Sequence, residues 1–436
     1  MLLRTVTLGL AGFFLIGSFN ITQTAINSLV LNTFGPEGIP LADLFKAGTA
    51  TLFCAIVLYQ RKLRVKLSRV VIGLNSLAMV YLLIFPLLQH LLPGLRQTLV
   101  LALALNGSAL ITSGIYSVWM LFTTVVPGAK TKHFTLFSVF LQVAAVAAVY
   151  LIRYLLATHN ISELLRYGAS GYAVAYSLVG IAMLRYSGVG GRLADFAEIE
   201  DKAAQQPLRA IAGAFSRPYL RGLFLVIILD VAFGSMVAWR VFRLAAQEHA
   251  VEDVALLLNR YGEYVSWGAL LSQLVAVPFF FHVLTPRYGL LVLPTAGMLV
   301  VTAVGLGVPA AAAIPIVATY TALDYTVNNC MRESLYMSLP LTVKVHFKSV
   351  FAFLAPRAGS VCGSLLLLAA SRWGLWLWFA ALVVVGTMWV LVAWRVLRFY
   401  GIYSAEGAKQ VQVATIDEIG VTVSEEHPLP TTEKIG

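Results

Sequence analysis

The sequence predicts an all-α membrane protein with twelve transmembrane helices arranged as two six-helix halves. The composition is 59% hydrophobic and only 12% charged, whereas about a quarter of the residues in a soluble domain are charged. Twelve apolar runs are each long enough to cross a bilayer, which takes about 20 residues in a helix. The alternating polar and apolar strands of an outer-membrane barrel do not occur. The expected partner is therefore the lipid bilayer.

The apolar runs follow one another with short polar breaks. They cover residues 7–30, 40–60, 70–92, 98–126, 134–157, 169–187, 219–246, 261–283, 288–306, 309–337, 349–371 and 374–396. The longest break separates the sixth run from the seventh. We therefore predict an N-terminal half at 1–187, a cytoplasmic linker at 188–218, a C-terminal half at 219–399 and a cytoplasmic tail at 400–436.

We predict different structures for two polar segments. The spacing over residues 192–214 of the linker predicts an amphipathic helix lying along the membrane surface. The tail after residue 400 is acidic and polar, and we expect it to be extended or disordered.

Lysine and arginine gather in alternate loops, including 61–69 and the linker, while the opposite loops carry few. The positive-inside rule places the basic loops and both termini in the cytoplasm. The net charge of +11 is accordingly a signal of topology, and we expect no nucleic-acid partner. The expected location is a bacterial inner membrane.

The two halves show a faint internal repeat. Pro127, His133 and Phe134 follow the fourth run, and Pro340, His346 and Phe347 follow the tenth at the same spacing. Two six-helix halves joined by a cytoplasmic linker form the layout of the major facilitator superfamily. Substrate sites in that superfamily lie between the halves near the middle of the membrane.

Four cations lie deep inside apolar runs, namely Lys46, Arg240, Arg332 and Arg357. Each costs about 2.5–3.5 kcal/mol at the bilayer centre, so each needs a partner, water or a ligand. We assign all four to substrate binding. Simpler readings remain open: Lys46 pairs with Asp43 one turn earlier, and Arg332 extends to the membrane surface.

The tenth run carries a polar stripe. Asp324, Asn328 and Arg332 recur every four residues and share one helix face, flanked by Glu333. We expect Asn328 to contact substrate, and Asp324 and Glu333, with Asp230 of the seventh run, to serve coupling or gating. The alternative is an Asp324–Arg332 pair that only joins helices.

The surplus of cations over acids favours an anionic substrate, and planar arginine favours phosphate or carboxylate. Nucleotide-binding loops, nucleophile elbows and zinc-protease motifs are absent from the sequence. The three cysteines (Cys54, Cys330 and Cys362) lie in separate runs. We expect no enzymatic activity, no metal and no cofactor.

Several segments resemble one known family. Arg332-Glu333-Ser-Leu-Tyr-Met-Ser-Leu-Pro340, the following Lys344-Val-His-Phe-Lys348 and then Arg357-Ala-Gly-Ser-Val-Cys-Gly363-Ser-Leu keep the order of its motifs. Ile39-Pro40, Phe45-Lys46, Leu58-Tyr59, Ala129-Lys130 and Trp239-Arg240 also match. This pattern resembles the nucleotide transporter family, the ATP/ADP translocases of plastids and intracellular bacteria. The acidic residues that the family has before Trp239 and Ala129 are missing, so the chain resembles a divergent member.

The resemblance implies a twelve-helix exchanger or importer in which Lys46 and Arg332 contact a nucleotide. Together with the charge pattern, it predicts a secondary active transporter of an organic anion, best a nucleotide or phosphorylated metabolite, working by alternating access. A coupling proton or a counter-substrate is the expected co-transported partner. Two alternatives stay open: a proton-coupled exporter of a drug, siderophore or lipid, and a non-transporting membrane assembly protein.

Overall fold

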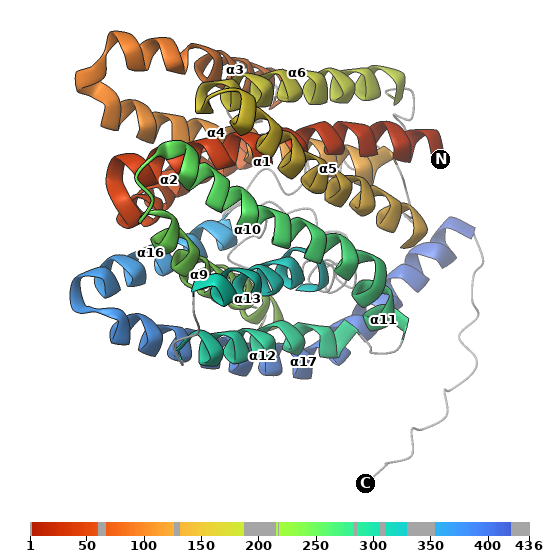
Figure 1. Ribbon diagram of the computed structural model, residues 1–436. Helices are drawn as coiled ribbons and strands as arrows, with labels where there is room; N and C mark the ends of the chain where they lie inside the picture. The colour runs from red at the N-terminus through yellow and green to blue at the C-terminus, as the bar shows by residue number, and fades with distance from the viewer. Residues whose placement is uncertain are drawn as a thin grey trace, which may run out of the picture.

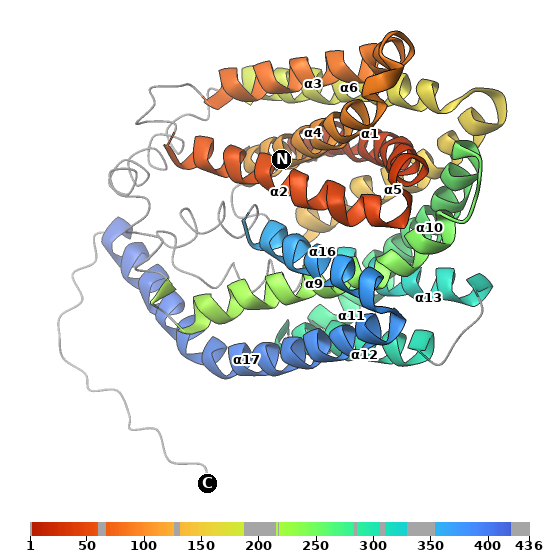
Figure 2. The same ribbon diagram turned by 90° about the vertical axis from the view of Figure 1, so that its left-hand side faces the viewer.

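The chain forms two stacked groups of helices, seen one above the other in Figures 1 and 2. The computed structural model describes residues 2–59, 67–125, 131–186, 215–216, 218–282, 286–305, 310–328 and 354–419. Every regular element within these ranges is a helix. The upper group in Figure 1 is the N-terminal half, and the lower group is the C-terminal half.

Each described helix overlaps a predicted apolar run. The N-terminal half contains α1 (Leu2–Phe34), α2 (Gly38–Tyr59), α3 (Leu67–Leu91), α4 (Arg96–Val125), α5 (Thr131–Thr158) and α6 (Ile161–Tyr186), with single turns η1 (Gly35–Glu37) and η2 (Pro93–Leu95).

The C-terminal half contains two segments of π-helix. Its elements are α9 (Pro218–Ala245), α10 (Val251–Leu271), the π segment η4 (Ser272–Ala276), α11 (Val277–His282), α12 (Pro286–Gly305), α13 (Ala310–Leu323), the π segment η5 (Asp324–Asn328), α16 (Ala355–Trp373) and α17 (Leu375–Ile419).

The last helix corrects one prediction. Helix α17 continues to Ile419, so the expectation of an extended or disordered tail is wrong for residues 400–419. The polarity of residues 400–419 argues against burial but not against the formation of a helix. This stretch contains alanine, lysine, glutamine and glutamate, and it has no proline. The predicted linker helix at 192–214 lies outside the described residues.

Five described segments are long and apolar enough to cross a membrane. They are Leu3–Leu52, which includes most of α1 and α2, and Pro93–Gly114, Leu136–Thr158, Pro218–Ala245 and Leu375–Phe399. Asn75–Leu91 and Leu290–Ala303 are shorter apolar helices. The full count of twelve crossings remains a prediction.

The two halves repeat one packing pattern. In the N-terminal half, α1 contacts α4, α5 and α6; in the C-terminal half, α9 contacts α13, α16 and α17. The first helix of each half therefore packs against the fourth, fifth and sixth predicted spans of the same half. This agreement supports the internal repeat that the sequence suggests.

Glycines allow the central helices to approach closely. A Cβ on Gly359 of α16 would lie 2.5 Å from the Ile228 carbonyl oxygen of α9, and one on Gly363 would lie 2.9 Å from the Ala232 carbonyl oxygen. Small residues at such contacts let helix backbones pack in lipid, where no hydrophobic effect drives association. Residue numbers increase in the same direction along both helices at these contacts (228 with 359, then 232 with 363), so α9 and α16 run parallel.

Contacts between the halves are found where α5 meets α10. The Asn259 amide donates to the Val149 carbonyl at 3.2 Å, and the Trp267 indole donates to the Tyr150 hydroxyl at 3.2 Å. Arg153 forms an ion pair with Glu263 in the same region. Asn32, at the end of α1, donates to the His249 carbonyl at 3.4 Å, beside the α9–α10 connection. These bonds join the halves at the end of the molecule that holds the α1–α2 and α9–α10 turns.

Gly359→Ala should lower the thermal stability of the protein in detergent, because the added Cβ meets the fixed backbone of α9. Overpacking of this kind costs about 1–3 kcal/mol. Gly180→Ala on α6 is the matched control, since a Cβ there meets nothing within 4 Å. Equal melting temperatures for the two variants would contradict the close α9–α16 packing.

Candidate functional site

A cluster of polar side chains lies between the halves, on α2 and α4 of the N-terminal half and α16 of the C-terminal half. Figure 2 shows α2 facing α16 across the boundary between the two groups of helices. Lys46 of α2 is 6% exposed, and its ammonium lies 3.0 Å from the Asp43 carboxylate. The i, i+3 spacing of these residues on one helix brings them together. The pairing with Asp43 that the sequence suggested is thus present.

Arg357 connects this pair to the other half. Its guanidinium donates to the Thr112 hydroxyl of α4 at 3.3 Å and interacts electrostatically with the Asp43 carboxylate. The α16 helix has a proline in its first turn, and Gly359 holds the following turn against α9. The arginine therefore belongs to a helix packed closely on α9 in the C-terminal half, while its partners belong to the N-terminal half.

Among the described residues, the charges of this cluster do not cancel. Lys46 and Arg357 contribute two positive charges, and Asp43 contributes one negative charge. Arginine has five N–H donors, and the only hydrogen bond described for Arg357 is the one to Thr112. A surplus positive charge, with arginine donors that have no other partner in the described ranges, is suited to an oxyanion.

A second cluster lies inside the C-terminal half. The Asn328 amide donates to Asp230 of α9 at 2.7 Å and to Asp324 at 2.8 Å. Asn328 and Asp230 are almost fully buried, at 0% and 1% exposed. One amide group thus joins two carboxylates that the sequence analysis assigned to coupling or gating.

The second cluster is built on the π segment η5. A π turn displaces the regular hydrogen-bond pattern of a helix and is frequent at functional sites. The η5 segment contacts η4, the other π segment of this half. Near it, the Tyr261 hydroxyl of α10 lies 2.8 Å from the Thr321 hydroxyl and interacts electrostatically with Asp324. This part of the C-terminal half therefore combines irregular backbone with buried polar groups.

The other predicted site residues have different outcomes. Arg240 is half-buried on α9, with no hydrogen bond or ion pair to the described part of the chain. It lies nine to twelve residues along α9 from Val231 and Ile228, which contact Gly359, a separation of roughly 13–18 Å at about 1.5 Å per residue. Its depth therefore differs from that of Arg357. Arg332 and Glu333 lie outside the described residues, and their roles stay predictions.

Sequence reasoning missed Thr112 and underrated Asp43. Thr112 is a single hydroxyl in an apolar run, a residue type that usually bonds to its own helix, and nothing in the local sequence distinguishes it. Asp43 was assigned only as the local partner of Lys46. Its position opposite Arg357 depends on the packing of α2 on α16, which no sequence spacing reveals.

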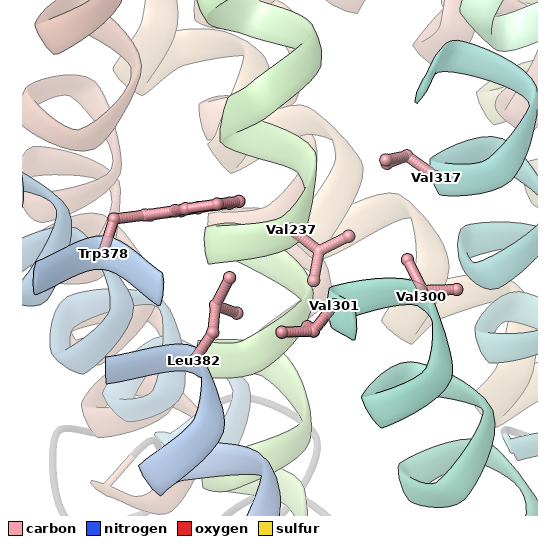
Figure 3. Close-up of a pocket in the computed structure, with 6 residues that line it drawn as sticks. All are labelled: Val237, Val300, Val301, Val317, Trp378 and Leu382. Atoms are coloured by element: carbon pink, nitrogen blue, oxygen red, sulfur yellow. The ribbon is translucent and has the colours of Figure 1, made fainter. Parts of the chain in front are cut away.

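An apolar gap in the C-terminal half lies apart from both clusters. Figure 3 shows it between α9, α12, α13 and α17, lined by Val237, Val300, Val301, Val317, Trp378 and Leu382. All six side chains are apolar along the lining, so the gap is suited to core packing and not to a charged substrate. No group of three or more His, Cys, Asp or Glu side chains placed to hold a metal occurs in the described ranges.

Solved structures of membrane transporters share this fold. A POT family transporter in complex with 5-aminolevulinic acid aligns with a TM-score of 0.59 at 10% identity, over 90% of this chain and 96% of the other. A bacterial homologue of the iron transporter ferroportin in the inward-facing state gives 0.58 at 15% identity, over 90% and 99%. The E. coli fucose:proton symporter gives 0.54 at 13% identity, over 90% and 97%.

These likenesses show that the chain has the fold of these membrane transporters. No protein-family model matches the sequence, and no curated protein is similar to it. The resemblance to the nucleotide transporter family therefore depends on the segments quoted from the sequence.

Asn328→Leu should destabilise the protein, because it removes both N–H donors from the buried carboxylate of Asp230 and the half-buried carboxylate of Asp324. Loss of such partners costs about 1–3 kcal/mol, measurable as a lower melting temperature in detergent. Thr319→Val on α13 is the control: Thr319 is exposed and bonds only to its own helix, so the change should be within about 0.5 kcal/mol. A stable Asn328→Leu variant would show that the amide bridge is dispensable.

Proposed function

We propose that the protein is a secondary active transporter of an organic anion, with a nucleotide or another phosphorylated metabolite as the best candidate. The observation that carries this proposal is the surplus positive charge between the halves, formed by Lys46 from one half and Arg357 from the other. Transporters of this layout bind substrate at such a boundary. An anion held there contacts both halves at once.

Contact with both halves is what alternating access requires. A ligand shifts a conformational equilibrium only by its different affinity for the two states. An anion that bridges Lys46 and Arg357 binds best when both cations reach it, so it favours conformations in which the halves close around it. Arg332, from the tenth predicted span, is proposed as a third cation at this position.

The remaining assigned residues have supporting roles in this proposal. Arg240, at a different depth in α9, would meet the anion on its way to or from the central cluster. Asp230, Asp324 and Glu333 would set coupling or gating, with Asn328 holding the first two in place. The nucleotide follows from the family resemblance, and the bacterial inner membrane with cytoplasmic termini follows from the loop charges.

Thermal stabilisation of the purified protein by a panel of anions tests the proposal. ADP, ATP, sugar phosphates and dicarboxylates are added in turn, since selective binding raises the melting temperature. We expect stabilisation by at least one phosphorylated compound. Lys46→Ala and Arg357→Ala should each weaken its affinity roughly tenfold or more, because each removes a charge-assisted hydrogen bond.

Arg243→Ala is the matched control. Arg243 stacks over Trp239 at 5.5 Å near the end of α9, away from Lys46 and Arg357, so its loss should leave the affinity unchanged. Counterflow of the stabilising anion in proteoliposomes then establishes transport. A protein that binds no anion in the panel, or that binds one equally well without Lys46 and Arg357, would refute the proposed site.

A further inference from the structure

The polar cluster inside the C-terminal half brings three oxygen-bearing side chains together. Asp324 and Asn328 are the first and last residues of the π segment η5, and Asp230 reaches them from α9. The Asn328 Nδ2 atom lies 2.7 Å from Asp230 Oδ2 and 2.8 Å from Asp324 Oδ1. One nitrogen atom is therefore within hydrogen-bond distance of two carboxylates, a position that also suits a small cation.

The Asn328 side chain has a second polar atom that its neighbours do not use. Asn328 is fully buried, and its carbonyl oxygen Oδ1 has no hydrogen-bond partner in the described part of the chain. The orientation of the amide is set by the NH2 group, because ionised carboxylates only accept hydrogen bonds. Buried acceptors without a partner are uncommon in proteins. This oxygen therefore points to a ligand that the neighbouring side chains do not supply.

The oxygen atoms of the cluster select the kind of ligand. Carboxylate and amide oxygens suit hard cations, whereas imidazole and thiolate suit transition metals. Calcium takes about six to eight oxygens, more than these three side chains offer, and magnesium keeps several of its waters. Asp230 and Asn328 are 1% and 0% exposed, which leaves little room for such waters. A singly charged ion that loses its water more easily, namely Na⁺, fits the cluster best.

The backbone of the cluster agrees with this choice. Two of the three side chains come from the ends of a π segment, and π turns are frequent at functional sites. In secondary transporters, carbonyl groups of interrupted helices coordinate Na⁺ near the middle of the membrane. The half-buried Asp324 is the more accessible of the two carboxylates, so an ion would reach the cluster from its side.

We propose that Asp230, Asp324 and Asn328 form a binding site for Na⁺. The ion lies between the two carboxylates, where the Asn328 NH2 group lies in this structure. A half-turn of the amide about its last torsion then brings Oδ1 toward the ion as a third ligand. The NH2 group holds the carboxylates together while the ion is absent. Binding of Na⁺ is independent of the proposed function, whereas its use as a coupling ion rests on that function.

Thermal shift of the purified full-length protein in detergent tests the site. NaCl replaces choline chloride stepwise at constant ionic strength and pH, so that only the identity of the cation changes. Selective binding to the folded state raises the melting temperature. We expect a saturable rise with Na⁺ and a much smaller rise with K⁺. Radioactive sodium should bind to the wild type at one ion per protein.

Two variants locate the ion. Asp324→Asn and Asp230→Asn keep the shape of the side chain and remove its charge, so each should raise the Na⁺ concentration for half-maximal stabilisation at least tenfold. Glu163→Gln is the matched control, because it removes a carboxylate that pairs with Arg166 on α6 of the N-terminal half. Its response to Na⁺ should equal that of the wild type.

The possible results separate the site from the proposed function. Equal responses to Na⁺, K⁺ and choline, as expected if a buried water is the partner of Oδ1, would overturn the inference. So would selective stabilisation by Mg²⁺ or Ca²⁺, or an unchanged Na⁺ response in both aspartate variants. Anion stabilisation without any Na⁺ response removes the Na⁺ site and leaves the proposed function standing. A selective Na⁺ response in a protein that binds no anion has the opposite meaning.

Discussion

Burial of charge in a low-dielectric interior governs the organisation of this protein. An ionised side chain in the hydrocarbon region is stable only beside a counter-charge, a hydrogen-bonding partner or water. The chain meets this requirement in two ways. The carboxylates of the C-terminal half share the amide of Asn328 within one half, whereas Arg357 finds Thr112 and Asp43 in the opposite half. The first arrangement stabilises a folded unit, and the second joins two units.

The helical architecture could be predicted from the sequence because each crossing carries its own signal. An apolar run of sufficient length specifies a helix whatever surrounds it, and all described helices overlap a predicted run. The exception, the continuation of α17 to Ile419, arises because polarity predicts exposure and not the loss of helix. The π segments η4 and η5 were not predictable either, since they depend on packing with neighbouring helices.

The candidate site was predictable only in its residue types. A lysine or arginine in an apolar run is conspicuous in any sequence, so Lys46, Arg240 and Arg357 were identified. Which of them lie together depends on the contact of α2 with α16 and on the depth of each residue along its helix. The sequence analysis accordingly treated Arg240 and Arg357 as equivalent, although the structure places them at different depths. Asp43 was correctly paired with Lys46, but its second neighbour comes from a helix more than three hundred residues away.

The glycine contacts of α16 have a mechanical consequence. Gly359 and Gly363 let the backbone of this helix lie close to that of α9, while on its other side α16 packs on α2 and Arg357 donates to Thr112 of the N-terminal half. If the C-terminal half tilted, Arg357 would therefore move together with α16 and α9. The gap to Thr112 and Asp43 would widen while the spacing of Asp230 and Asn328 stays constant. The bond of Arg357 to Thr112 thus depends on how the halves lie, whereas the bond of Asn328 to Asp230 is internal to one half.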